Sequence, residues 1–296
     1  MAAIFISGFT FIRNGVQFDY PFEESIRSML PLVDELIINV GVGSDATLVR
    51  IHALAKQDKK IQIFESTWDD SLREGGRILA EQTNLAIQRC KGKWGLYLQA
   101  DEVLHEEDYD LIRAAIKKAD KDSRIDGILF DYVHFYGDFF VVNCNPSAYR
   151  HEVRAIRLGY QIFSWKDAQG FRKKVGENRF EKLQVLRSKA RIFHYGWVRP
   201  PEVMKEKTVA MDKLYHSEGE GTGNNYRYKR IYGLERFKGT HPALMEQRVK
   251  EKKWQIDLMA APLVFTVKDI RKVLARLVEK VTGRLPFEYK NYRKIG

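Results

Sequence analysis

The stretch that decides the fold runs from Trp94 to Asp108 and reads WGLYLQADEVLHEED. It begins as an apolar run, which predicts a buried strand, and it passes into acids at Asp101 and Glu102, where we expect the strand to end. Ligands of open α/β sheets bind beyond the carboxyl ends of the strands, where divalent cations prefer carboxylate oxygens. The pattern therefore indicates a binding site at these two acids, with capping of the following helix as the alternative.

Strand and helix patterns alternate on both sides of this stretch. Strands are predicted at 3–9, 35–40 and 61–64, with helices beginning near Pro21, after Asp45 and at Gly75. A helix at 105–119 and a hairpin at 126–143 follow. This alternation predicts an α/β fold with a mostly parallel, doubly wound central sheet flanked by helices.

The second half of the chain has a different pattern. We expect strands at 153–158 and 190–198, a helix at 200–215, a glycine-rich loop at 217–225 and a basic amphipathic helix at 267–281.

Composition restricts the possible partners. The net charge is +11 over 296 residues, and residues 268–296 hold nine basic side chains against three acids. Such a charge attracts anions, including acidic membrane surfaces. We expect no nucleic-acid partner, because the basic residues gather at the tail without a recognition motif. The two cysteines exclude a disulfide framework, and the chain shows no signal peptide or spanning segment, which together predict a cytoplasmic or peripheral inner-membrane location.

A set of motifs in fixed order resembles family 2 glycosyltransferases with the GT-A fold. The motifs are Asn39-Val40-Gly41-Val42-Gly43-Ser44-Asp45, Gly75-Gly76, Asn84, Gly92 and Leu98-Gln99-Ala100-Asp101-Glu102. The resemblance covers residues 3–147. It implies a GT-A domain at 1–218, with a nucleotide-sugar half at 1–147 and an acceptor half at 148–218, and then a Tyr/Arg-rich and basic helical C-terminal extension at 219–296.

The resemblance also implies a set of binding residues. The nucleotide-sugar contacts it implies are Phe9, Asn39, Gly41, Ser44, Gly76, Asn84, Gln99, Ala100, Asp101, Glu102 and Arg199. Asp101 and His194 would hold Mn²⁺ or Mg²⁺, which would neutralise the departing diphosphate. The chain departs from the family at Gln99, which stands where an acid usually contributes to the metal site.

Family members that this chain resembles invert the anomeric centre, which requires a carboxylate base at the acceptor hydroxyl. Asp167, between Trp165 and Phe171, is the predicted base, although its neighbours are also typical of a turn. Glu152, Asp138 and Asp131 are the alternatives.

The resulting hypothesis is a glycosyltransferase that uses a nucleoside-diphosphate sugar, a UDP-sugar first, to extend a glycan or lipid-linked acceptor in cell-surface polysaccharide or glycolipid synthesis. Two other classes stay open: a nucleotidyltransferase of sugar phosphates, and a nonenzymatic protein that binds an anionic ligand. The basic helix at 267–281 predicts contact with an anionic membrane.

Overall fold

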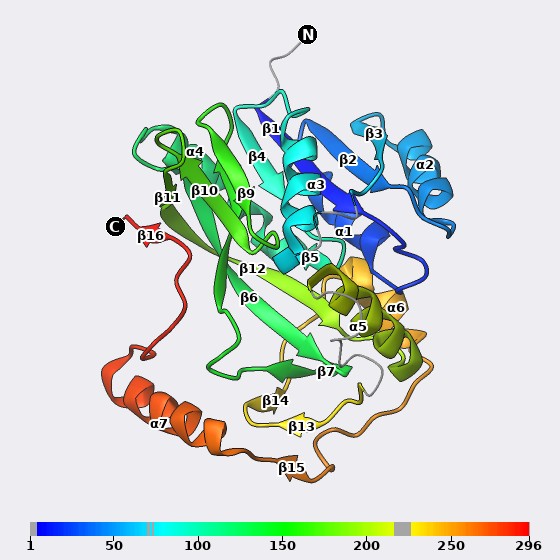
Figure 1. Ribbon diagram of the computed structural model, residues 1–296, viewed down its shortest axis with the longest axis vertical. Coiled ribbons are helices and arrows are strands. Elements are labelled where there is room, and N and C mark those ends of the chain that lie inside the picture. The colour runs from blue at the N-terminus through cyan, green and yellow to red at the C-terminus, as the bar shows by residue number, and fades with distance from the viewer. Residues whose placement is uncertain (1–4, 70–71, 73, 216–225, 296) are drawn as a thin grey trace.

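The computed structural model describes residues 5–69, 72, 74–215 and 226–295, and it contains a curled central sheet with helices on both faces (Figure 1). The strands are β1 (Ile6–Ile12), β2 (Glu35–Gly41), β3 (Ile61–Ser66), β4 (Trp94–Tyr97), β5 (Glu102–Leu104), β6 (Gly127–Tyr136), β7 (Asp138–Asn143), β8 (His151–Arg157), β9 (Ile162–Trp165), β10 (Gly170–Lys174), β11 (Phe180–Lys182), β12 (Gln184–Trp197), β13 (Arg230–Ile231), β14 (Leu234–Arg236), β15 (Leu263–Val264) and β16 (Arg293–Lys294). The helices are α1 (Phe22–Met29), α2 (Thr47–Gln57), α3 (Arg77–Ile87), α4 (Tyr109–Asp120), α5 (Pro201–Tyr215), α6 (Glu246–Lys250) and α7 (Val267–Thr282), with short 3-10 turns η2 (Glu74–Gly76), η3 (Glu106–Asp108) and η5 (Ala243–Met245).

The central sheet has a parallel half and a largely antiparallel half. β3, β2, β1 and β4 lie side by side and run parallel. β8 then runs antiparallel to β4, and β6 antiparallel to β8. The long strand β12 pairs in parallel with β6 and antiparallel with β5. The predicted α/β fold is confirmed, but the parallel order ends at β4 and does not continue through the rest of the sheet.

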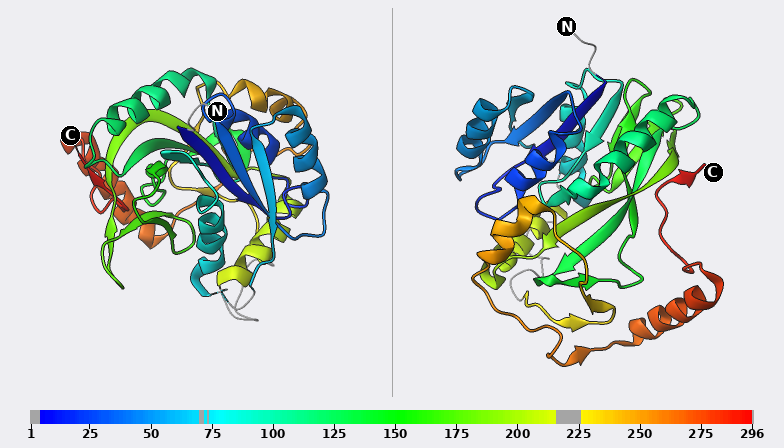
Figure 2. Two further views of the ribbon diagram at one scale, coloured as in Figure 1. Left: turned by 90° about the horizontal axis from the view of Figure 1, so that it is seen from above. Right: turned by 180° about the vertical axis from the view of Figure 1, so that it is seen from behind.

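Alternate side chains of each parallel strand pack on opposite faces of the sheet. Leu36, Ile38 and Val40 of β2 join the core formed with α1, α2 and α4. Ile37 and Phe9 join the core on the other face, formed with α3 and the small sheet of β9, β10 and β11. Figure 2 shows the sheet from above with α4 on one side and α3 on the other. This two-sided burial explains the continuous apolar runs in the sequence.

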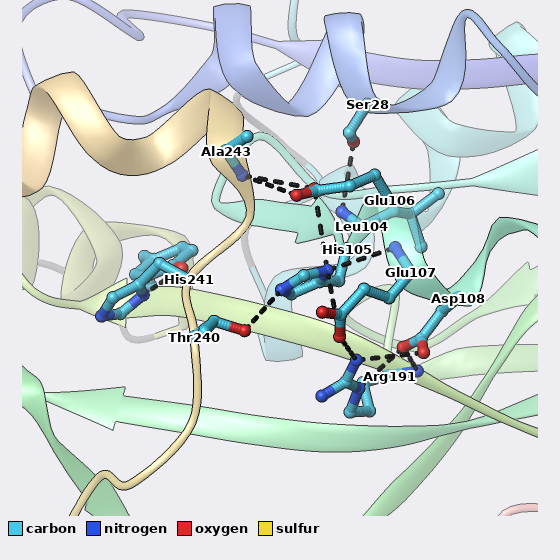
Figure 3. Close-up of polar contacts among 11 residues, drawn as sticks. Ser28, Leu104, His105, Glu106, Glu107, Asp108, Arg191, Thr240, His241 and Ala243 are labelled. Atoms are coloured by element: carbon cyan, nitrogen blue, oxygen red, sulfur yellow. Dashed lines mark hydrogen bonds and ion pairs between the residues drawn. The ribbon is translucent and has the colours of Figure 1, made fainter.

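Segments on both sides of α7 return to the central sheet. β14 pairs with β7, and β16 pairs with the beginning of β12. Figure 3 shows how residues 240–243 are tied to the region after β5: the Thr240 hydroxyl lies 3.1 Å from His105 Nε2, and the Ala243 N–H donates to the Glu106 carboxylate at 3.2 Å. The predicted domain boundary at 218–219 and the glycine-rich loop at 217–225 fall outside the described residues.

None of the helices in the described part of the chain combines the length and the apolar character that crossing a bilayer requires.

Candidate active site

Asp101 lies in a tight turn between β4 and β5. β4 ends at Tyr97, earlier than the apolar pattern predicts. The Gln99 carbonyl accepts the Glu102 N–H at 3.0 Å and the Ser25 hydroxyl at 3.1 Å, and the Asp101 carbonyl accepts the Tyr195 N–H at 2.8 Å. These backbone bonds hold the Asp101 side chain beyond the carboxyl end of the parallel strands.

Glu102 has a structural role, which corrects the expectation that it lies in a binding loop. It is fully buried as the first residue of β5. Both of its oxygens accept from the Arg154 guanidinium at 2.8 Å. The Tyr132 hydroxyl donates to Glu102 at 2.7 Å, and the Gln99 N–H donates to it at 3.0 Å. Its lone pairs are therefore committed to bracing the turn that carries Asp101.

His194 is brought to Asp101 by the register of β12. It lies opposite Glu102 of β5 and opposite His134 of β6. His194 Nε2 is 3.7 Å from Asp101 Oδ1, which is too long for a hydrogen bond. The structure therefore brings the two predicted metal ligands together without a direct bond between them.

A chain of hydrogen bonds determines where the His194 proton lies. His134 Nε2 is 2.6 Å from the Tyr149 carbonyl, which can only accept, so Nε2 carries the proton. His134 Nδ1 is then an acceptor, and His194 Nδ1, 2.9 Å away, must donate to it. Burial lowers the pKa of both rings, that of His134 to about 3, and keeps them neutral. His194 Nε2 consequently presents a lone pair toward Asp101.

The gap between these two acceptors is kept open by Gly196. A Cβ atom at this position would collide with His194 Nε2 and lie 3.2 Å from Asp101 Oδ2. A carboxylate oxygen and a neutral imidazole are ligands that suit Mn²⁺, and a carboxylate suits Mg²⁺. No group of three or more His, Cys, Asp or Glu side chains in the described ranges could hold a metal. The pair therefore fits a divalent cation only if substrate and water supply the other ligands.

Lys207 of α5 is a site residue that sequence reasoning missed. Its ammonium donates to the Gly196 carbonyl at 2.8 Å and to Asp101 Oδ2 at 3.3 Å. Burial would raise the pKa of Asp101, but the positive charges of Lys207 and Arg199 outweigh it and hold that pKa at about 2. Burial, with help from Arg199, lowers the pKa of Lys207 to about 7. Asp101 is thus an anion inside the protein, with one oxygen facing a cation and the other facing the open gap.

Two cavities meet at this carboxylate. The first, of about 920 Å³, lies between β1, the 99–101 turn and α5. The second, of about 790 Å³, lies between β8, the β9–β10 turn, α5 and residues 287–289. Leu79, Gln99, Asp101, Lys207 and Met211 line both cavities. Gln99 and Asp101 thus lie where one bound molecule could touch another.

The two cavities differ in chemistry. The first is lined by aromatic rings, among them Phe18 and Trp68, and by the basic side chains Arg13, Lys205, Lys207 and Lys213. Trp68 also has the Arg13 guanidinium 4.9 Å from its ring centre. Rings and cations together suit a ligand with a flat base and phosphates.

The second cavity holds two carboxyl groups with incomplete hydrogen bonding. Asp167 lies in the turn between β9 and β10, where its Oδ2 accepts from the Tyr215 hydroxyl at 2.9 Å. Glu152 of β8 is buried, and burial raises its pKa to about 8. In the described structure, Asp167 Oδ1 and Glu152 Oε2 are buried with no hydrogen-bond partner. The other two acids considered from the sequence are paired outside this cavity, Asp131 with Arg187 and Asp138 with Lys252.

Three of the predicted nucleotide-sugar contacts lie away from the two cavities: Phe9 and Asn39 are core positions, and Asn84 is partly buried. Phe9 is fully buried and stacks on Tyr97 with ring centres 5.2 Å apart. Asn39 is fully buried, and its amide donates to Gln82 Oε1 at 2.9 Å. Asn84 Oδ1 accepts a backbone N–H of β9 at 2.7 Å and ties α3 to the small sheet. None of the three lines either described cavity.

Two more of the predicted contacts, Gln99 and Ala100, line the first cavity with Asp101. Arg199 is fully buried, donates from Nε to the Phe18 carbonyl at 2.7 Å and lowers the pKa of Asp101 through its charge, but it lines neither cavity.

The three predicted small residues lie near the cavities without lining them. Ser44 N–H donates to Asn14 Oδ1 at 3.3 Å, and Asn14 lines the first cavity. Gly41 ends β2, where a Cβ would meet Trp68. Gly76 has a positive φ of 70°, and a Cβ there would lie 2.8 Å from that of Asp167. Their lack of bulk lets the neighbouring segments approach.

Comparison with protein-family models and with curated proteins gives no match. Solved structures that match include S. aureus TarS, at 14% identity and a TM-score of 0.40, with 72% of this chain and 41% of that chain covered. They also include TarS 1–349 in complex with UDP, at 13% identity and a TM-score of 0.40, with 71% and 65% covered. A mannosyltransferase from Pyrobaculum calidifontis in complex with GDP-Man and Mn²⁺ matches at 15% identity and a TM-score of 0.36, with 53% and 45% covered. This chain spans about two fifths of the length of the full TarS chain.

Proposed function

We propose that this chain is a glycosyltransferase that moves a sugar from a nucleoside-diphosphate sugar to an acceptor hydroxyl. The observation that carries the proposal is the meeting of two chemically different cavities at one buried, ionised carboxylate, Asp101. A transfer reaction needs this layout, because donor and acceptor must touch at one point while their other parts lie apart.

The first cavity is the proposed donor site. Its aromatic rings would stack on the base, while Arg13, Lys205 and Lys207 would attract the diphosphate. A UDP-sugar is the first donor to test. Lys207, whose side chain is largely buried where the two cavities meet, would stabilise negative charge on the leaving diphosphate.

A divalent cation completes this proposal, with Mn²⁺ preferred to Mg²⁺ because an imidazole is one of the ligands. Asp101 Oδ1 and His194 Nε2 would hold it. When bound, the ion would act as a Lewis acid toward the diphosphate oxygens.

The second cavity is the proposed acceptor site. In an inverting transfer the acceptor oxygen bonds to the anomeric carbon as the bond to the diphosphate breaks, and a carboxylate takes the hydroxyl proton. Asp167 is the first candidate for that carboxylate, and Glu152 is the alternative at a pH above its pKa of about 8; each has an unpartnered oxygen there. The acceptor would be a growing glycan or a lipid-linked sugar of a cell-surface polysaccharide.

The test is a thermal-shift panel of UDP-, GDP-, dTDP- and CMP-sugars with and without Mn²⁺. A bound donor raises the melting temperature by mass action. We expect one sugar nucleotide to give a metal-dependent shift that Asp101→Asn abolishes and Asp110→Asn, at an exposed position of α4, retains. Stabilisation by a sugar phosphate with a nucleoside triphosphate would favour a nucleotidyltransferase, and stabilisation only by an anionic polymer would favour a nonenzymatic binding protein.

Measuring the rate of sugar transfer from the identified donor then tests Asp167 and Glu152 as the base. Asp167→Asn or Glu152→Gln should remove transfer while leaving the donor-induced shift unchanged, because neither side chain lines the first cavity. Full activity in both variants would contradict this part of the proposal.

A further inference from the structure

The helix α7 turns its apolar side away from the protein. Six of its side chains, 44% to 87% exposed, form a stripe along one face, namely Val267, Ile270, Leu274, Leu277, Val278 and Val281. Leu263, Val264 and Phe265, just before the helix, are also exposed. A continuous apolar surface of this extent is unusual on the solvent-exposed side of a helix. Such a surface typically marks a site of contact with another molecule or a membrane.

The outward orientation is fixed by polar contacts on the opposite side of α7. Glu279 forms an ion pair with Arg150 of the segment before β8. Arg276 donates to the Cys144 carbonyl at 2.7 Å and to Glu235 of β14 at 3.0 Å. The polar side of the helix therefore packs on the protein, which is the reverse of an ordinary surface helix.

The helix is also well specified by its own sequence. Thr266 and Asp269 form a capping box at its N-terminus, and Gly283 ends it with a positive φ of 67°. Figures 1 and 2 show α7 at one edge of the molecule, apart from the parallel strands. The exposed stripe is therefore not the product of a poorly formed helix.

The basic side chains beside the apolar stripe of α7 indicate which kind of partner covers the stripe. Lys268, Arg271, Lys280 and Arg284 are exposed, whereas the two acids of the helix are both paired with basic residues, Asp269 with Lys272 and Glu279 with Arg150. A second copy of the chain docked stripe to stripe would bring these cations together. An anionic bilayer instead offers an apolar interior for the stripe and negative headgroups for the cations.

We propose that α7 and residues 263–265 dock on an anionic lipid surface, with the helix lying in the plane of the bilayer. Phe287 and Tyr289, which follow the helix, line the second cavity. Docking would therefore hold this cavity next to the membrane surface. The docking itself does not depend on the proposed transferase activity.

The experiment is co-sedimentation of the full chain with vesicles, in the absence of nucleotide. Vesicles of phosphatidylcholine with about one third phosphatidylglycerol are compared with pure phosphatidylcholine at two salt concentrations. We expect binding to the anionic vesicles that weakens with salt, and a loss of roughly tenfold or more in the binding constant for Leu274→Glu with Leu277→Glu. Lys280→Glu with Arg284→Glu should weaken binding to anionic vesicles alone.

A matched control comes from exposed apolar residues of other helices. Val49 of α2 and Leu111 of α4 are exposed, so Val49→Glu with Leu111→Glu makes the same chemical change away from the stripe. This variant should bind vesicles as the unmodified chain does. Equal binding by both double variants, or no binding to any vesicle, would overturn the proposal, as would a dimer that only the α7 variant disrupts. The donor-induced thermal shifts are measured without lipid, so a failure of the membrane-docking proposal would leave them unchanged.

Discussion

The turn at Asp101 and the face of α7 each reverse the usual distribution of side chains, in opposite ways. Around Asp101, charged groups are buried: Asp101, Glu102 and Arg154. On α7, an apolar stripe is exposed while Arg276 and Glu279 on the opposite side contact the protein. Buried charges are retained where paired groups hold a reactive geometry, and exposed apolar groups are retained where something covers them. The comparison separates the proposed site for a ligand from the proposed surface for membrane docking.

The largest expected effect concerns the brace under the turn. Arg154→Met leaves Glu102 buried without its partner and should lower the free energy of unfolding by about 3–5 kcal/mol. Urea denaturation measures this change, and Arg113→Met, which removes an exposed ion pair, should cost less than about 1 kcal/mol. A small loss for Arg154→Met would show that the buried pair does not stabilise the turn.

Removing the central carboxylate should affect chemistry and leave the fold intact. Asp101→Asn is expected to lower the rate of transfer by about 10²- to 10³-fold. The substitution removes the anion that holds Lys207 in place and that would bind the divalent cation. Steady-state kinetics with the identified donor measure it, with Asp110→Asn as the control. Near-normal activity would remove Asp101 from the proposed machinery.

The raised pKa of Glu152 predicts a pH dependence of stability. Its folded pKa is about 8 against a reference value of 4.5, so the folded form holds the proton more tightly. Stability should therefore fall as the pH rises from about 4.5 through 8. Glu152→Gln removes that loss and should be more stable than the unmodified chain at pH 9 by roughly 2–4 kcal/mol, with little difference at pH 4.5. Urea midpoints at both pH values test this, and the exposed Glu81→Gln should leave the pH dependence unchanged.

The proton arrangement between the two histidines predicts a smaller effect. His134→Phe removes the acceptor that fixes the His194 proton on Nδ1, and it should weaken Mn²⁺ binding by about 10- to 100-fold. Titration followed by electron paramagnetic resonance reads the ion directly, without turnover. His52→Gln on α2 is the control, and unchanged affinity in His134→Phe would contradict the assigned tautomer.

The smallest effect is expected on α7. Leu274→Glu with Leu277→Glu should change the free energy of unfolding by less than about 0.5 kcal/mol per residue, because these side chains are already in water. By contrast, Leu96→Ala in β4 should cost about 2–5 kcal/mol. A large loss for the α7 variant would mean that the stripe packs on the protein.

Periodicity predicted the parallel half of the fold well. Local sequence patterns predicted the strands β2 and β3 and the helices α1, α4 and α7, because apolar runs and helical spacing involve residues that are close in sequence. The antiparallel half and the small sheet were less visible, since strand direction depends on pairing between distant segments.

The site was predictable only in part. The sequence named Asp101 and His194 together, and the structure places them 3.7 Å apart. The core positions of Phe9 and Asn39 depend on which face of a two-sided sheet each side chain takes. Lys207 had no local signal, because a lysine in an amphipathic helix is ordinarily a solvent-exposed residue.

Gly196 has a consequence for how this protein can vary. It performs no chemistry, yet any side chain there would fill the space between His194 and Asp101. A single methyl group at position 196 would thus close the proposed cation position with every charged residue still in place.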